Sequence, residues 1–134
     1  VTNTLDEVPA DQVILGMPFY TRIWSLTPKD TDNVSQTDTS DSSNYTTSSS
    51  VYGMEQAAAE VLDNQATASW DSASGQNYAE WTKDNVIYKV WLEDSSSMEE
   101  RLKLVTGNSL AGAAFWKLGF ETSSIWDTVI KYIN

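Results

Sequence analysis

The residues best suited to chemistry follow two apolar runs that lie far apart in the chain. Tyr20 and Arg22 come at the end of the run over residues 13–20, and Trp116 ends the run over residues 110–116. Because Tyr20 and Arg22 are two positions apart, they share one side of a strand. Binding and catalytic side chains of α/β barrels lie where strands open into loops. The two runs therefore predict a binding surface built from a phenol, a guanidinium and an indole.

The composition limits the chemistry and the partners. The chain has 134 residues, with no Cys, no His and a net charge of −11 from 8 Lys and Arg against 19 Asp and Glu. The negative charge repels phosphate backbones and anionic headgroups, so we expect neither a nucleic-acid nor a membrane partner. Without His and Cys, the commonest general base and the usual zinc ligands are missing. We expect no metal and no cofactor, and any chemistry relies on carboxylates, Tyr, Lys, Ser or Thr.

Other features suggest a piece of a larger protein. A complete eight-fold barrel needs roughly 250 residues, so this chain is too short to form one. It starts at Val1 without a Met and without a signal-peptide pattern. Asp30 and Asp32 begin like a calcium loop, but Val34 occupies a ligand position and Ser35 replaces the turn Gly. We therefore interpret this polar region as a solvated loop.

Two strands of the parallel type are predicted to carry the candidate residues. The runs over residues 13–20 and 110–116 are nearly continuously apolar, as expected of strands buried on both faces. A helix before the second strand is predicted from possible capping boxes, and another follows it, with Ser124 and Asp127 as its cap. The capping pairs of the first helix are Ser96 with Glu99 and Ser97 with Glu100. The predicted buried stripes are Met98, Leu102 and Val105 in the first helix and Ile125, Trp126, Val129, Ile130 and Ile133 in the second.

A separate unit is predicted between these strands. Residues 25–50 are rich in Ser, Thr, Asp and Asn, which predicts a long loop. Residues 68–70, 76–81 and 86–92 are strand-like, with turn sequences at residues 71–75 and 83–85. A one-sided helix is indicated by Met54, Ala57, Ala58, Val61 and Leu62. Residues 25–92 are thus predicted to form a small antiparallel sheet with one helix.

Three segments in this order resemble the last part of a family 18 glycoside hydrolase, the chitinase family, which includes bacterial spore-cortex and cell-wall members. The segments are GMPFYTR at 16–22, WLED at 91–94 and LAGAAFW at 110–116. The family pattern is Gly-hydrophobic-Pro-Phe-Tyr-Gly-Arg on barrel strand seven, then an α+β insertion domain, then Gly-Gly-x-x-x-Trp on strand eight. Thr21 departs from the usual Gly. The resemblance covers nearly the whole chain.

The resemblance implies an α/β fold with an α+β insertion. Residues 1–24 and 93–134 would form the C-terminal part of a (β/α)8 TIM barrel, strands seven and eight with their helices. Residues 25–92 would form the chitinase-type insertion domain, of antiparallel strands plus one helix. Since the excised strands would lack partners on one side, we predict that this piece self-associates into a dimer or higher oligomer.

The resemblance also implies substrate-binding residues. Tyr20 and Arg22 match the pair that bonds the sugar at and beside the cleavage point, and Trp116 matches the Trp that forms the floor beneath it. A pyranose has an apolar face that stacks on indole and hydroxyls that need fixed donors and acceptors. Glu93 could face the same cleft, and Trp24 and Trp91 could line it.

Each of these residues also has a structural interpretation. A buried Tyr that bonds water, or an Arg paired with a surface Asp, would give the same sequence pattern as Tyr20 and Arg22. Trp126 lies in a helix stripe and is expected in a core, while Trp70 and Trp81 are expected to pack the insertion sheet. Gly112 and Ala114 share one side of a strand with Trp116, as in a tapering barrel interior.

The function implied is hydrolysis of β-1,4-linked N-acetylglucosamine polymers, chitin or peptidoglycan, outside the cell or at the cell wall. The family uses a substrate-assisted retaining mechanism, in which the acetamide of the sugar attacks the anomeric carbon while a Glu protonates the leaving oxygen. That Glu ends an Asp-x-x-Asp-x-Asp-x-Glu motif on strand four, which no segment here matches. We therefore expect no catalytic residue in this chain, and an inactive piece that binds an N-acetylglucosamine oligosaccharide weakly.

Two alternatives stay open. One is a non-catalytic, carbohydrate-binding relative in which the strand-four Glu is missing. It would keep Tyr20, Arg22 and Trp116, so this chain does not separate it from an enzyme. The other is a free-standing α+β interaction module, which predicts a monomer with no affinity for N-acetylglucosamine oligomers.

Overall fold

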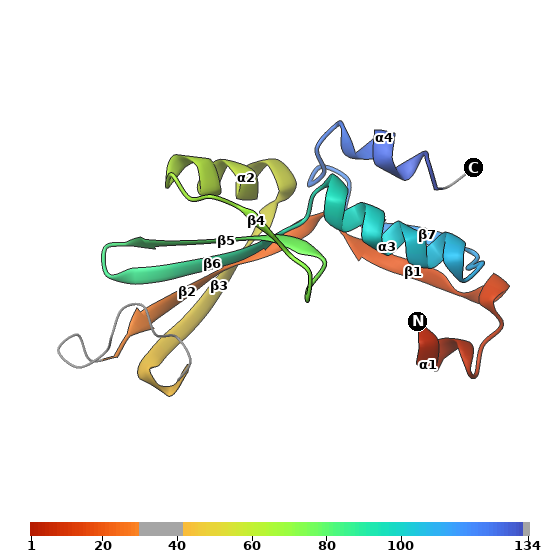
Figure 1. The fold of residues 1–134 in the computed structure, drawn as a ribbon, viewed down its shortest axis with the longest axis horizontal. Coiled ribbons are helices and arrows are strands. Elements are labelled where there is room, and N and C mark those ends of the chain that lie inside the picture. Colours follow the sequence, from red (N-terminus) through yellow and green to blue (C-terminus); the bar gives the residue numbers. More distant parts are fainter. Residues whose placement is uncertain (30–41, 133–134) are drawn as a thin grey trace.

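The computed structural model describes residues 1–29 and 42–132, which form an α/β structure with two sheets (Figure 1). The helices are α1 (Thr2–Leu5), η1 (Ala10–Gln12), η2 (Ser42–Asn44), α2 (Met54–Asp63), α3 (Ser95–Gly107) and α4 (Ile125–Val129). The strands are β1 (Ile14–Pro18), β2 (Tyr20–Pro28), β3 (Tyr45–Gly53), β4 (Ser69–Asp71), β5 (Gln76–Lys83), β6 (Val86–Leu92) and β7 (Gly112–Trp116). The acidic loop candidates Asp30 and Asp32, and Ile133, lie outside the described residues.

The smaller sheet is a parallel pair, β1 with β7, as the two apolar runs predict. Its register aligns Ile14 with Gly112 and Pro18 with Trp116, so both strands end at the same level. The predicted first strand is too long, because the chain turns at Phe19 and Tyr20 already starts β2. The Phe19 amide donates to the Trp116 carbonyl at 2.7 Å, which closes the end of the pair.

One hydrophobic core lies between the parallel pair, α3 and α4. Phe19 is fully buried and stacks on Phe115 at 4.8 Å between ring centroids, with the Trp126 ring edge-on at 5.5 Å. The predicted stripe of α3 is confirmed, since Met98, Leu102 and Val105 are buried. In α4, Ile125 and Val129 are buried and Trp126 is partly buried, but Ile130, predicted to be buried, is 57% exposed.

The larger sheet is antiparallel, with the strand order β3-β2-β6-β5-β4. The prediction of a loop over residues 25–50 is wrong at both ends, because β2 continues to Pro28 and β3 begins at Tyr45. The serines and threonines of these strands are compatible with pairing because one sheet face is open to solvent. The hydrogen bond between the hydroxyls of Ser25 and Ser48, which are cross-strand partners, is also exposed, with the two oxygens 2.8 Å apart.

Helix α2 covers one face of this sheet (Figure 1) and forms a second core with it. Its buried residues are Met54, Ala57 and Val61, whereas Ala58 and Leu62, also predicted in the stripe, are exposed. The predicted turn between β5 and β6 is confirmed, with Asp84 and Asn85 at positive φ, as a tight hairpin requires. The second core consists of Ile23, Ala57, Val61, Ala79, Trp81, Val90 and Leu92.

The cap of α3 is Asp94, two residues before the first predicted cap. Its carboxylate accepts from the amides of Ser96 and Ser97 at 2.8 and 3.0 Å, and the Ser97 hydroxyl accepts from the Asp94 amide at 3.0 Å. The predicted pairs of Ser96 with Glu99 and Ser97 with Glu100 are therefore wrong, since Asp competes well for the cap position. Ser124 precedes α4 but makes no capping hydrogen bond with its side chain.

The two sheet regions meet closely at Gly53, the last residue of β3. A Cβ atom at Gly53 would lie 3.0 Å from the Phe120 carbonyl oxygen and 3.2 Å from the Phe120 Cα. The Met54 amide donates to that same carbonyl at 2.7 Å. A side chain here would therefore require the Phe120 backbone to shift by a few tenths of an ångström.

Within residues 1–29 and 42–132, no helix is both long enough and apolar enough to cross a membrane.

Candidate functional site

Two adjoining hollows share Tyr20 as a wall residue. The first, of about 330 Å³, lies at the carboxyl ends of β1 and β7. Pro18, Tyr20 and Trp116 are among its lining residues, and Trp116 is 68% exposed. Trp116 thus presents a ring to solvent at the end of its strand, which is the placement that the sequence predicts.

The second hollow, of about 360 Å³, lies against the five-stranded sheet. Its walls contain five of the six predicted substrate-binding residues. These are Tyr20, Arg22, Trp24, Trp91 and Glu93. The structure therefore brings all six predicted residues to two hollows that meet at Tyr20, with Trp116 in the first hollow only.

Strand alternation explains the arrangement on β2. Tyr20, Arg22 and Trp24 point to the face opposite α2, whereas Thr21 and Ile23 are buried on the other side. Arg22 Nη1 donates to the hydroxyl of Ser49 on β3 at 2.7 Å. The guanidinium is held by a neutral hydroxyl at an exposed position, so it keeps donors for a further acceptor.

Glu93 lies in the wall of the second hollow, yet it is only 6% exposed and its carboxylate is occupied. Arg101 donates to it through both terminal nitrogens at 2.6 and 2.8 Å, the bidentate geometry of a strong ion pair. The Ser97 hydroxyl and the Gln76 amide also donate to it, at 2.9 and 3.0 Å. Burial raises the pKa of Glu93 to about 7, while the Arg101 guanidinium and the Ser97 hydrogen bond act in the opposite direction.

Trp91 is held by its neighbours in a fixed orientation. Its indole Nε1 donates to Asp71 Oδ2 at 3.2 Å, and its ring lies 4.8 Å from that of Tyr78. The Thr21 hydroxyl donates to its carbonyl. Hydrogen bonds, first that of the Ser74 hydroxyl, lower the pKa of Asp71 and keep it an acceptor for the indole.

The sequence reasoning missed the residues that hold Glu93 and Trp91. Ser97 and Arg101 are four positions apart in α3 and so share one side of the helix, which is a local signal, although Glu93 itself precedes the helix. Gln76 and Asp71 come from a different hairpin, and no local pattern connects them with their partners.

The remaining tryptophans differ in their burial. Trp126 packs against the core around Phe19, and Trp81 is buried beneath α2, both as predicted. Trp70, also predicted to pack the sheet, is 46% exposed because β4 is a short strand at the sheet edge.

The family model for glycosyl hydrolases family 18 matches residues 2–121. The chain belongs to this family. This finding confirms the resemblance of the three motifs to that family.

This family 18 chain has a curated relative whose name refers to the lysis of cortical fragments. It is 25% identical over 130 residues to the cortical fragment-lytic enzyme of Bacillus subtilis, a match that covers 94% of the chain and 26% of that enzyme. The chain thus spans about a quarter of the length of this curated relative.

Solved structures show the same fold. The spore cortex-lytic enzyme SleL of Bacillus megaterium superimposes with a TM-score of 0.77 at 17% identity, over 99% of this chain and 28% of that one. A chitinase variant from Cycas revoluta, solved in complex with (GlcNAc)4, superimposes with a TM-score of 0.61 at 17% identity, over 94% of this chain and 34% of that one.

Proposed function

We propose that this chain is the C-terminal part of a (β/α)8 barrel in a glycoside hydrolase that cleaves β-1,4-linked N-acetylglucosamine polymers. In this proposal β1 and β7 are barrel strands seven and eight, and residues 25–92 form the insertion domain. The parallel pairing of β1 with β7 supports it, as does the antiparallel sheet that the chain forms between them. Strand β2 crosses the proposed boundary at residue 24, so one strand joins the two parts.

The observation that carries the proposal is the junction of the two hollows at Tyr20. A pyranose ring would stack its apolar face on Trp116, while Tyr20 and Arg22 bond its hydroxyls. Trp24 and Trp91 would contact the next sugars along the second hollow. Glu93 would act as a wall residue, since its carboxylate already bonds three protein side chains.

The chemistry would follow the substrate-assisted retaining route of the family. The acetamide oxygen of the substrate attacks the anomeric carbon, and a carboxylic acid protonates the leaving oxygen. We assign no catalytic residue to these 134 residues, so the acid would come from the rest of the parent protein. The chain itself would bind and orient the sugar without cleaving it.

Chitin and peptidoglycan both contain β-1,4-linked N-acetylglucosamine, and the relatives include a chitinase and a cortical fragment-lytic enzyme. Because both polymers lie outside the cytoplasm, we propose an extracellular or cell-wall location for the parent enzyme.

The test is a titration of the chain with (GlcNAc)4, followed through tryptophan fluorescence. Trp116→Ala and Arg22→Ala are each expected to weaken binding by about tenfold, which corresponds to one lost stacking or charged contact. Trp70→Ala is the matched control, since Trp70 is also exposed but lies outside both hollows. Equal binding by all three variants, or no binding by the unsubstituted chain, would contradict the proposal.

A further inference from the structure

A third hollow, the α2 hollow, lies between α2 and the sheet, on the face opposite Tyr20. It measures about 190 Å³ and is partly enclosed. Trp81 and Tyr88, cross-strand partners in β5 and β6, form an aromatic wall with their rings stacked at 5.4 Å and 8° between planes. Ile23 of β2 adds an aliphatic surface. The hollow is therefore bordered by one stacked aromatic pair and one aliphatic side chain, of which Trp81 and Ile23 are largely buried.

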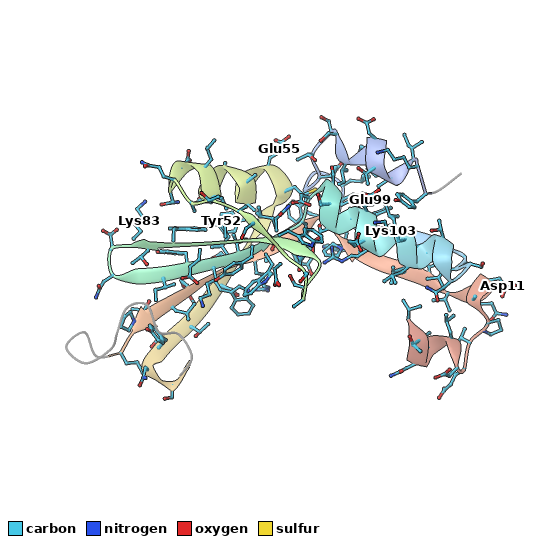
Figure 2. The ribbon with its side chains drawn as sticks, viewed as in Figure 1. Asp11, Tyr52, Glu55, Lys83, Glu99 and Lys103 are labelled. Atoms are coloured by element: carbon cyan, nitrogen blue, oxygen red, sulfur yellow. The ribbon has the colours of Figure 1, made fainter. Side chains whose placement is uncertain are left out.

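Polar groups surround this apolar wall. The rim contains Tyr52 of β3, Lys83 of β5, and Glu60 and Asn64 of α2. Figure 2 shows Tyr52 close to α2 and Lys83 at the far end of the β5–β6 hairpin. Among the residues that the structure describes, the Tyr52 and Tyr88 hydroxyls and the Lys83 amine have no hydrogen-bond partner. These groups are thus free to bond a ligand.

The charges of the rim indicate a neutral ligand. Glu60 and Lys83 carry opposite charges, so they balance within the hollow although the chain as a whole has a net charge of −11. The Asn64 amide donates to the Glu60 carbonyl at 2.8 Å and lies 3.5 Å from its carboxylate, which leaves acceptor capacity on Glu60. A polyhydroxylated, uncharged ring matches this set of donors and acceptors better than an ion does.

We propose that the α2 hollow binds a single pyranose unit of an N-acetylated glycan, as a second site separate from the hollows at Tyr20. The volume is below the roughly 300–1,000 Å³ of common ligand pockets, so it fits one ring rather than an oligomer. The class of glycan rests on the proposed function. The aromatic wall, the unpartnered donors and the balanced charge carry the site itself.

A site on this face would not compete with the first. The α2 helix and the residues around Tyr20 lie on opposite sides of the sheet, so the two sites would bind different chains of a polymer or distant parts of one chain. Attachment at a second point raises the effective concentration of the first site near an insoluble substrate.

The six tryptophan indole N–H signals in an NMR spectrum of the whole chain report on the two sites separately. Titration with (GlcNAc)4 is expected to shift the Trp81 signal saturably. Trp24, Trp91 and Trp116 report on the hollows at Tyr20 in the same samples. In a Trp116→Ala variant, the Trp81 shift is expected to keep its midpoint.

Two variants test the rim directly. Lys83→Ala and Tyr52→Phe are each expected to raise the dissociation constant read from Trp81 by about five- to tenfold, because each removes one donor. Lys103→Ala on α3 is the matched control and should leave this dissociation constant unchanged, since Lys103 does not line the hollow and bonds Glu100. Tyr52→Phe keeps the ring and so guards against loss of folding.

The outcomes separate this site from the proposed function. A stationary Trp81 signal while Trp116 shifts would overturn the α2 site and leave the proposed function supported. A Trp81 shift that disappears in Trp116→Ala, or that ignores both rim variants, would also overturn it as an indirect effect. If none of the tryptophans shifts, the proposed function fails as well.

Discussion

The two sheet regions differ in how completely they are covered. The five-stranded sheet carries α2 on one face and has its own core beneath that helix. The parallel region has only two strands, a number that is marginal for a sheet in water. Figure 1 shows the two regions side by side, with α3 along the parallel pair. The antiparallel region is therefore close to a self-sufficient unit, and the parallel region depends more on its neighbours.

Exposed apolar side chains show the same difference. Of the five large apolar side chains that are more than half exposed in the described residues, four lie in or near the parallel pair and α4, namely Ile14, Trp116, Leu118 and Ile130. The fifth is Leu62 on α2. In the barrel that we propose, neighbouring strands and helices of the parent would cover such surfaces. The comparison thus agrees with the proposal that one region is cut from a larger fold while the other is complete.

The largest expected effect tests the independence of the two regions. Phe19→Ala removes a fully buried ring between Phe115 and Trp126, and we expect it to destabilise the parallel region by about 3–5 kcal/mol. The transition reported by Trp81, in the other core, should shift by less than about 1 kcal/mol. Urea unfolding followed by the indole NMR signals measures both. Equal shifts would mean that the two regions unfold as one unit.

A smaller effect concerns Glu93. Its hydrogen bonds to Ser97 and Arg101 of α3 and to Gln76 of β5 join the helix to the antiparallel sheet. Its pKa is about 7 in the folded chain against an ordinary 4.5, so the folded state holds this proton more tightly than the unfolded state does. Stability from this group is present below pH 4.5 and lost as pH rises through 7, by about 2–3 kcal/mol between pH 5 and 8. Urea titrations at several pH values measure the slope.

Glu93→Gln should flatten that slope, and Glu100→Gln, an exposed substitution on the same helix, should leave it unchanged. If the slope is as steep in Glu93→Gln as in the parent chain, other groups cause the pH dependence. The junction would then not be sensitive to protonation.

The weakest effect is self-association, which remains a prediction. The exposed apolar residues of the parallel region favour contact between copies, while the net charge of −11 opposes it. Sedimentation velocity at high concentration should show a dimer or larger species, and Leu118→Gln with Ile130→Gln should weaken it by several fold. A monomer at all concentrations would show that the exposed edge alone does not drive association.

The sequence predicted the parallel region better than the first half of the antiparallel one. Long apolar runs and the 3.6-residue spacing of Met98, Leu102 and Val105 are local signals, and both survive in the structure. Strands β2 and β3 contain many Ser and Thr residues, and a composition typical of loops concealed their pairing. The cap of α3 was misplaced because several polar residues in a row could serve as caps.

The sequence predicted the residues that line the candidate site, but not the residues that hold them in place. Each of the six predicted residues lines at least one of the two hollows, because strand alternation and the motif positions place it there. Their roles remain predictions. The contacts of Glu93 with Gln76 and of Trp91 with Asp71 depend on hairpin placement, which no sequence spacing encodes.

The close approach at Gly53 has a consequence for protein engineering. A Cβ there would press on the backbone of Phe120, which has no side-chain freedom with which to yield. In a chimera that exchanges the antiparallel unit between homologous enzymes, a larger residue at this position would require the Phe120 backbone to move by a few tenths of an ångström. The exchanged unit should therefore carry glycine at position 53, so that the close contact with Phe120 is kept.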